Sequence, residues 1–194
     1  DDAFKDLADY VEKEYKNWYL DQLSSNWNKV IESDLGSTGK ISGLAQQTDF
    51  YRDIVKNVDG KVFVIISDAM RYDVAQSLAK QLEIETKADV EISAQQGIYP
   101  TITKYGMAAL LPHKTLEAVE NNGTTKVLVD GYPSEMSDRD GILKSYSENS
   151  VALKYKDIIS MKRDDRRAAV KGKDIIYIYH DTIDASSHND ENSV

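Results

Sequence analysis

The 194-residue chain contains no cysteine, no apolar run as long as a membrane span and no signal-peptide pattern at its start. The lack of cysteine excludes disulfide bonds and cysteine-ligated zinc, and we expect a cytoplasmic protein. Basic residues are fewer than acidic ones: the chain has 24 Lys and Arg and 33 Asp and Glu, which gives a formal net charge of −9. This balance argues against broad electrostatic binding to nucleic acid. We therefore expect no membrane segment and no general polyanion-binding surface.

Three signatures of common enzyme folds are missing as well. The chain has neither the GxGxxG nor the GxxxxGK[ST] pattern of phosphate-binding loops, and no GxSxG elbow typical of an α/β-hydrolase. What is present, 41% apolar and 29% charged residues, is ordinary for a folded protein of one substantial domain, alone or with an appendage. Six Lys and Arg residues lie within positions 162–173, and we interpret this run as a solvated face or loop.

The first segment, residues 2–33, is predicted to be helical because its apolar residues recur at three- and four-residue spacing. Two Trp and several Tyr belong to this stripe, so another surface must bury it. It packs either on the chain's own sheet domain or within a larger preceding helical region, and the start of the chain inside the pattern favours the second. Glycine-rich residues 36–43 then mark a connection. We predict a helical segment and linker over residues 1–43 and a second domain over residues 44–194.

Residues 44–194 alternate between strand-like and helix-like patterns. The predicted helices cover residues 46–57, 70–82, 104–111 and 142–147, and the predicted strands cover residues 62–66, 86–93, 126–129 and 174–179. The run from Val62 to Ile66 is continuously apolar, as is typical of a strand buried on both faces. This alternation predicts an α/β fold, a sheet with helices on both faces, preceded by the N-terminal helical segment.

Candidate chemical groups lie directly after apolar strands or in a turn that opens a helix. They are Asp68, the turn Pro100-Thr101-Ile102-Thr103-Lys104, and the segment His180-Asp181-Thr182-Ile183-Asp184 with His188 beyond it. In a parallel sheet such strand ends converge on one edge. Carboxylates and imidazoles without cysteine suit divalent metals such as Zn, Mn or Mg. A hydroxyl at a helix start beside a lysine suits a metal-activated nucleophile.

Each of these groups also has a simpler structural interpretation. Asp68 or Ser67 would cap the helix that follows, and either threonine of the turn would cap the next one. His180 would be a satisfied, partly buried side chain, and Asp184 with His188 would belong to a flexible terminus. The functional interpretation therefore depends on the combination of the three segments.

The order of these segments resembles that of the alkaline phosphatase superfamily. The stretches VFVIISDAMRYD at 62–73, PTITKYGMAALLPH at 100–113 and IYIYHDTID at 176–184 resemble one branch of it, the PglZ proteins of phage-growth-limitation and BREX antiviral systems. The resemblance covers residues 46–194. It implies an alkaline-phosphatase-like α/β fold with two divalent metal ions.

The resemblance also implies roles for particular residues. Asp68 would bind one metal, Thr103 would attack phosphorus and contact the same metal, and Asp184 with His188 would bind the other. Thr103 matches better than Thr101 because two leucines follow it at the sulfatase spacing and a lysine follows it directly, as in the pyrophosphatases.

Two basic residues near these positions would assist. By the same resemblance, Lys104 or Arg71 would neutralise phosphate charge. Arg71 would alternatively pair with Asp73 or cover the sheet edge.

Two features depart from the superfamily pattern. The Asp-His pair and the final His that complete its metal sites would follow Val194, so we expect a fragment of a longer protein with incomplete metal sites. Ser187 stands before His188, where the pyrophosphatases carry Gly.

We therefore expect the longer protein to be a metal-dependent phosphoester hydrolase of phage defence. Its substrate would be a phosphoester, with nucleic acid and nucleotides among the candidates, and this fragment would be inactive and bind metal weakly. The alternative is a non-catalytic scaffold that binds other defence-system proteins. The aromatic N-terminal stripe, the basic run and the missing ligands favour that alternative.

Overall fold

The computed structural model describes the backbone of residues 2–190 and the side chains of residues 4–187. The chain divides into two compact units, residues 1–44 and 45–194. The first unit is a continuous helix formed by α1 (Asp2–Glu14), a π-helical turn η1 (Tyr15–Leu20) and α2 (Asp21–Thr38). It ends at Gly39, which adopts a left-handed φ of 68° and donates its N–H to the carbonyl of Leu35.

Most of the apolar stripe of this first helix is exposed, and Ile31 near its end is buried. Its large exposed side chains are Phe4, Leu7, Tyr10, Val11, Tyr15, Trp18, Tyr19, Leu23, Trp27 and Val30. The rings of Tyr15 and Tyr19 stack within the π-helical turn, with centroids 5.5 Å apart. The three- and four-residue spacing thus forms a helix, as predicted, and leaves a strongly aromatic surface on it.

The second unit alternates strands and helices. Its elements are β1 (Ala45–Gln46), the 3₁₀ turn η2 (Gln47–Asp49), α3 (Phe50–Asp53), the 3₁₀ turn η3 (Val55–Asn57), β2 (Val62–Ser67), α4 (Tyr72–Glu85), β3 (Gln95–Gln96), α5 (Thr103–Ala109), β4 (Leu116–Asn121), β5 (Thr124–Val129), β6 (Tyr132–Pro133), α6 (Arg139–Tyr146), β7 (Ser150–Lys154), α7 (Tyr155–Ser160), α8 (Arg163–Ala169), β8 (Ile175–His180) and α9 (Thr182–Asp190).

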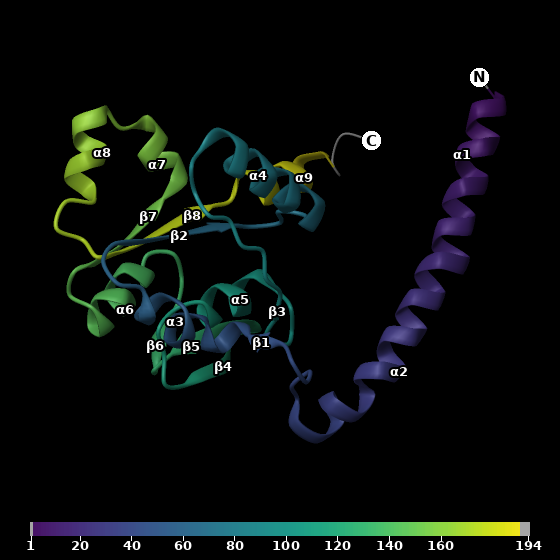
Figure 1. The fold of residues 1–194 in the computed structure, drawn as a ribbon. Helices are drawn as coiled ribbons and strands as arrows, with labels where there is room; N and C mark the ends of the chain where they lie inside the picture. Colours follow the sequence, from purple (N-terminus) through teal and green to yellow (C-terminus); the bar gives the residue numbers. More distant parts are fainter. Residues whose placement is uncertain (1, 191–194) are drawn as a thin grey trace. The chain divides into compact units, whose positions relative to one another are not determined.

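The principal sheet has the order β2-β8-β7, and both of its pairings are parallel. Val64 lies opposite Tyr177, and Ser67 lies opposite His180 at the carboxyl end of the two strands. Helices α7 and α8 lie on one face of this sheet, while α3, α5 and α6 lie on the other (Figure 1). The predicted α/β fold class, with helices on both faces of the sheet, is confirmed.

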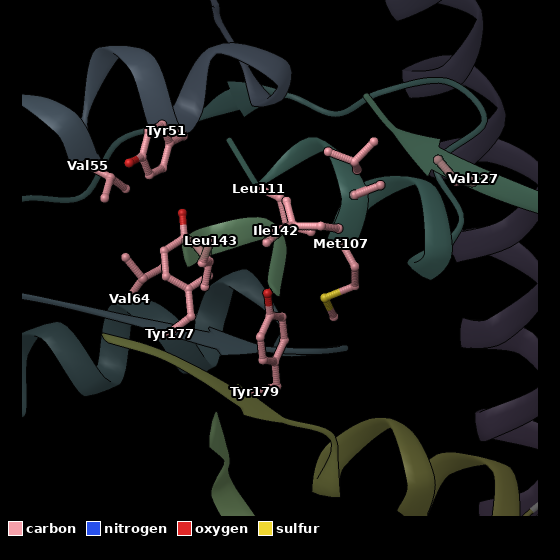
Figure 2. Close-up of a cluster of buried hydrophobic side chains, with 12 residues drawn as sticks. Tyr51, Val55, Val64, Met107, Leu111, Val127, Ile142, Leu143, Tyr177 and Tyr179 are labelled. Carbon is pink, nitrogen blue, oxygen red and sulfur yellow. The ribbon is translucent and has the colours of Figure 1, made fainter. Parts of the chain in front are cut away.

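The hydrophobic core lies between the second of these faces and a small antiparallel sheet. Figure 2 shows Tyr177 and Tyr179 of β8 pointing into this core, toward side chains of α3, α5 and α6. The antiparallel sheet, in the order β4-β5-β6, contributes Val127 and Val129. The hydroxyl of Tyr177 donates a 2.8 Å hydrogen bond to the carbonyl of Leu110, so the end of α5 is tied directly to the sheet. This packing fixes the helix that begins at Thr103.

One predicted strand does not form. Residues 86–93 were expected to pair in the sheet, but they run without regular hydrogen bonding between α4 and β3, and Ile92 is exposed. Their alternating pattern fits a strand, yet a strand needs a neighbour to satisfy its backbone groups. Among the described residues none pairs with residues 87–94, and β2 has β8 as its single neighbour.

Candidate functional site

Asp68 follows β2 directly and sits in a tight turn. Its N–H donates to the carbonyl of His180 at 3.0 Å, which extends the pairing of β2 with β8 by one bond. Its Oδ1 accepts the N–H of Ala69 at 3.1 Å, and Ala69 has a positive φ of 60°. A left-handed conformation is uncommon for alanine and often occurs beside functional residues. Helix α4 begins with Arg71 as its N-cap and has no side-chain cap, so the interpretation of Asp68 or Ser67 as that cap is wrong.

Asp68 and Thr103 line the same pocket. This cavity of about 370 Å³ lies between the end of β2, the loop before α5 and the first turns of α5. Thr101 lines it as well, so both threonines of the turn border the cavity. Helix α5 has Ile102 as its N-cap and no side-chain cap, so neither threonine serves as the expected cap. The structure therefore gathers Asp68 and two threonines at the carboxyl edge of the sheet.

Gln47 is a pocket residue that the sequence did not single out. Its Oε1 accepts the N–H of Ile98 at 3.0 Å. A Cβ added at Gly106 of α5 would lie 3.3 Å from its Nε2, so the glycine allows the amide to lie close against the helix. No pattern around Gln47 indicated this role, because it comes from a short 3₁₀ turn that reaches the pocket through the tertiary fold.

Asp184 lies in the first turn of α9, which follows β8 at the same sheet edge as Asp68. It is half-buried and does not belong to the residues that line the Asp68–Thr103 pocket. The backbone of His188 belongs to α9, whereas its side chain lies outside the described residues. The structure therefore brings Asp68 and Thr103 into one cavity and places Asp184 in the helix that follows the neighbouring strand.

His180 is held at the end of β8. Its Nδ1 shares a 2.9 Å hydrogen bond with the Oγ of Ser67. The ring of Tyr155 meets the imidazole edge to face, with centroids 4.7 Å apart. Next to it, the hydrogen bond from Lys156 holds the pKa of Asp181 below its ordinary value. The interpretation of His180 as a satisfied, half-buried side chain agrees with these contacts.

Neither of the two predicted basic residues lines the pocket. The ammonium of Lys104 donates to the carbonyl of Thr125 at 2.9 Å, which links α5 to β5. Arg71 pairs through two hydrogen bonds with Asp73 on the surface, the alternative foreseen for it. None of the described residues that line the cavity is basic.

The donor set of the pocket suits a hard divalent cation, because carboxylate and hydroxyl oxygens are the ligands that such ions prefer. The number of such donors is nonetheless too small for a complete metal site. Within the part of the chain that the structure describes, no three His, Asp or Glu side chains lie close enough together to hold a metal ion. Asp68 and Thr103 can supply part of a metal site and no more.

A second cavity, of about 420 Å³, lies at the opposite end of the same strands. Tyr51, Val62, Leu111 and Ile175 form much of its wall. Ligands of open α/β sheets bind at the carboxyl ends of the strands, and this cavity lies at the amino ends. The Asp68–Thr103 pocket is therefore the better candidate for chemistry.

Comparison with known proteins decides the family. Residues 48–194 match the model of the BREX system PglZ alkaline phosphatase-like domain. The chain belongs to the PglZ family. It is 42% identical to the alkaline phosphatase-like protein BrxZ of Escherichia coli O9:H4 (strain HS) and 41% identical to the alkaline phosphatase-like protein PglZ of Bacillus cereus (strain H3081.97). These alignments cover 94% and 95% of this chain.

The PglZ chain described here spans 22% of the length of each of these two relatives. No solved structure matches it. Among its described helices, none is both long enough and apolar enough to cross a membrane. The predicted family and its alkaline-phosphatase-like domain are confirmed, while the roles of individual residues stay predictions.

Proposed function

We propose that the longer PglZ protein hydrolyses a phosphoester at the sheet edge where β2 ends. The observation that supports this most is the pocket shared by Asp68 and Thr103. The whole of α4 separates these residues in sequence, and the sheet and α5 bring them together. A carboxylate and a hydroxyl at the carboxyl edge of a parallel sheet are the groups that in-line attack on phosphorus requires.

In the proposed reaction Thr103 is the nucleophile. Its Oγ forms a bond to phosphorus while the bond from phosphorus to the leaving oxygen breaks, and water then hydrolyses the phosphothreonine to restore the hydroxyl. Asp68 and Thr103 would hold one divalent ion, and Asp184 with His188 would hold a second. When bound, such ions lower the pKa of the hydroxyl and neutralise charge on the phosphoryl oxygens. Other parts of the longer protein would complete both ligand sets.

The remaining proposals concern a role for Lys104, the substrate class, the partners and the location of the protein. Lys104, at the second position of α5, would add positive charge near the phosphoryl group. Nucleic acid or a nucleotide is the proposed substrate class, other BREX proteins are the proposed partners, and the cytoplasm is the proposed location. Both relatives carry names of alkaline phosphatase-like proteins, which supports a phosphoester substrate, and the family model names the BREX system, which supports BREX proteins as partners.

The test uses the full-length protein and a nitrophenyl phosphodiester with added Zn or Mn. Thr103→Ala is expected to lower turnover by at least about 100-fold and leave metal content unchanged, because a nucleophile contributes to chemistry more than to coordination. Asp68→Ala is expected to lower both. Thr101→Ala is the matched control and should keep its activity.

Two outcomes would change the proposal. Loss of activity in Thr101→Ala with full activity in Thr103→Ala would move the nucleophile by two residues. Full activity in both variants, with metal bound, would overturn the covalent mechanism in favour of attack by an activated water.

A second candidate function is a scaffold for defence proteins. The exposed aromatic stripe on α1 and α2 favours it, because aromatic side chains dominate protein interfaces. Metal analysis of the full-length protein separates the two candidates. About two metal ions per chain would support catalysis, and a metal-free protein that still binds its partners would support the scaffold.

A further inference from the structure

The ends of β2 and β8 are joined by two hydrogen bonds that both involve His180. Ser67 and His180 are register partners, and the Oγ of Ser67 lies 2.9 Å from Nδ1 of the imidazole. The carbonyl of the same histidine accepts the N–H of Asp68 at 3.0 Å. One residue of β8 therefore holds the last residue of β2 and the residue that follows it, Asp68, which is the candidate metal ligand.

The imidazole itself has little freedom. It is half-buried, and the ring of Tyr155 stands against it at an interplanar angle of 86°. The next residue, Asp181, pairs with Lys156 at 3.1 Å. Tyr155 and Lys156 both belong to the first turn of α7. The end of β8 is thus fixed by β2 on one side and by α7 on the other.

The two segments that leave this junction carry the candidate ligands. Asp68 is the residue after Ser67, and α9 with Asp184 begins two residues after His180. A shift of β2 along β8 would change the spacing between Asp68 and α9, and metal sites and catalytic groups tolerate displacements of only about 0.5 Å. The side-chain bond between Ser67 and His180 opposes such a shift at the point where it matters.

We propose that His180 is a positioning residue whose hydrogen bond with Ser67 sets Asp68 relative to α9. This inference rests on the proposed function, since it concerns the same sheet edge. His180 acts through Asp68 and does not contact the substrate. Partners of metal ligands in such positions are worth about 10- to 100-fold in metal affinity or activity.

A matched pair of substitutions tests the inference in the full-length protein. His180→Asn places an amide group near the position of Nδ1 and can keep the bond to Ser67. His180→Gln places its amide near the position of Nε2 and loses that bond. We expect His180→Asn to stay within about threefold of wild type in Mn or Zn affinity and in kcat. We expect His180→Gln and Ser67→Ala each to weaken metal affinity or kcat by about tenfold or more.

The readouts are calorimetric metal titration, steady-state hydrolysis and the thermal unfolding midpoint. A merely structural role would lower the midpoint of His180→Gln and Ser67→Ala without changing metal affinity or kcat in the folded protein. The two residues share one hydrogen bond. The double variant Ser67→Ala/His180→Gln should therefore lose no more metal affinity or kcat than the worse of the two single variants.

The outcomes separate this inference from the proposed function. Wild-type affinity and turnover in both His180→Gln and Ser67→Ala, in an active wild-type background, would overturn the inference alone. Equal losses in His180→Asn and His180→Gln would also overturn it, because they would show that the Ser67 bond is not the cause. A wild type that neither binds metal nor hydrolyses phosphoesters would overturn both the inference and the proposed function.

Discussion

At the scale of single residues, Asp130 of the second unit is a carboxylate that accepts several hydrogen bonds. Its Oδ1 accepts the backbone N–H groups of Lys114 and Thr115, each at 2.8 Å, and its Oδ2 accepts the hydroxyl of Tyr146. Burial works to raise the pKa of Asp130, but the bonds from Tyr146, Thr115 and Lys114 outweigh it and hold the pKa below its ordinary value. Burial and Asp130 together raise the pKa of Tyr146 to about 12.

This arrangement predicts an acid-dependent contribution to stability. The folded pKa of Asp130 is lowered, so its stabilisation is complete above the unfolded value of about 3.9 and is lost as the pH falls through the folded pKa. Asp130→Asn should lower the free energy of unfolding by about 1–3 kcal/mol at pH 7. The difference from wild type should shrink below about pH 4. Urea denaturation of wild type and Asp130→Asn at pH 7 and pH 3 measures this difference in the free energy of unfolding.

The control for this experiment is Asp59→Asn. Asp59 is exposed and makes no hydrogen bond or ion pair within the part of the chain that the structure describes. Its replacement should change stability little at either pH. An equal effect of the two substitutions would contradict the role given to the Asp130 hydrogen bonds.

At the scale of elements, α5 is fixed from two sides. Tyr177 of β8 bonds to the carbonyl that ends the helix, and Lys104 in its first turn bonds to β5. The Lys104 ammonium also lies 5.7 Å from the centroid of the Tyr105 ring. The helix that carries the proposed nucleophile is therefore attached to both sheets.

The Lys104 contact gives a prediction that separates two roles. If the ammonium is an anchor, Lys104→Met should lower stability by about 1–2 kcal/mol, because a charged hydrogen bond to Thr125 is lost. If it also neutralises phosphate charge in the full-length protein, the same variant should in addition lower kcat of the folded protein. We expect a loss of stability, with a weakened but measurable reaction. Lys126→Met, on the exposed side of β5, is the control and should change neither quantity.

The elements that the sequence predicted correctly are those with a strong local pattern. The apolar run of β2 and the Asp-Ile-Ile-Tyr-Ile-Tyr run of β8 formed neighbouring parallel strands, with β8 at the centre of the sheet. The expectation that β2 is buried on both faces is wrong, because Phe63 and Ile65 are exposed on this outer strand. The short β7 was missed because Ser150–Lys154 mixes polar and apolar residues, and β8 pairs with it through tertiary structure. The predicted helix at 46–57 is broken into α3 and two 3₁₀ turns.

Some residues of the candidate site could be predicted from the sequence and others could not. Strand ends and the opening of a helix located Asp68 and Thr103, because parallel strands bring their carboxyl ends together. The Ser67–His180 bond was not predictable, since it depends on the register of two strands separated by most of the domain. Gln47 was missed for a similar reason, because its place in the pocket comes from how η2 meets α5.

At the scale of the whole molecule, the chain consists of two units with different surfaces. The second unit has a buried core of aromatic and aliphatic residues, whereas the first is a single helix with an exposed aromatic stripe. The chain also covers 22% of the length of its two relatives. The properties of the complete protein therefore need to be measured on the complete protein.

The 194-residue chain is itself predicted to bind divalent metal weakly. Its pocket offers the Asp68 carboxylate and threonine hydroxyls, and such a set provides too few donors to offset the dehydration of the ion. Calorimetric titration with Zn or Mn should show no stoichiometric binding at submicromolar concentrations. Tight one-to-one binding would show that other residues of the chain complete the site, and Asp68→Ala would then reveal whether this pocket is involved.

The π-helical turn at Tyr15–Leu20 sets the rotational phase of the aromatic stripe. Apolar residues recur there at every fourth position, as in Tyr15, Tyr19 and Leu23. An α-helix turns by about 100° per residue, so a four-residue step advances the stripe by about 40°. The wider turn of a π-helix counteracts this drift. Deleting Asn17 should convert this turn into regular α-helix and leave the two halves of the stripe at nearly the same relative rotation, because the wider turn accommodates about one extra residue.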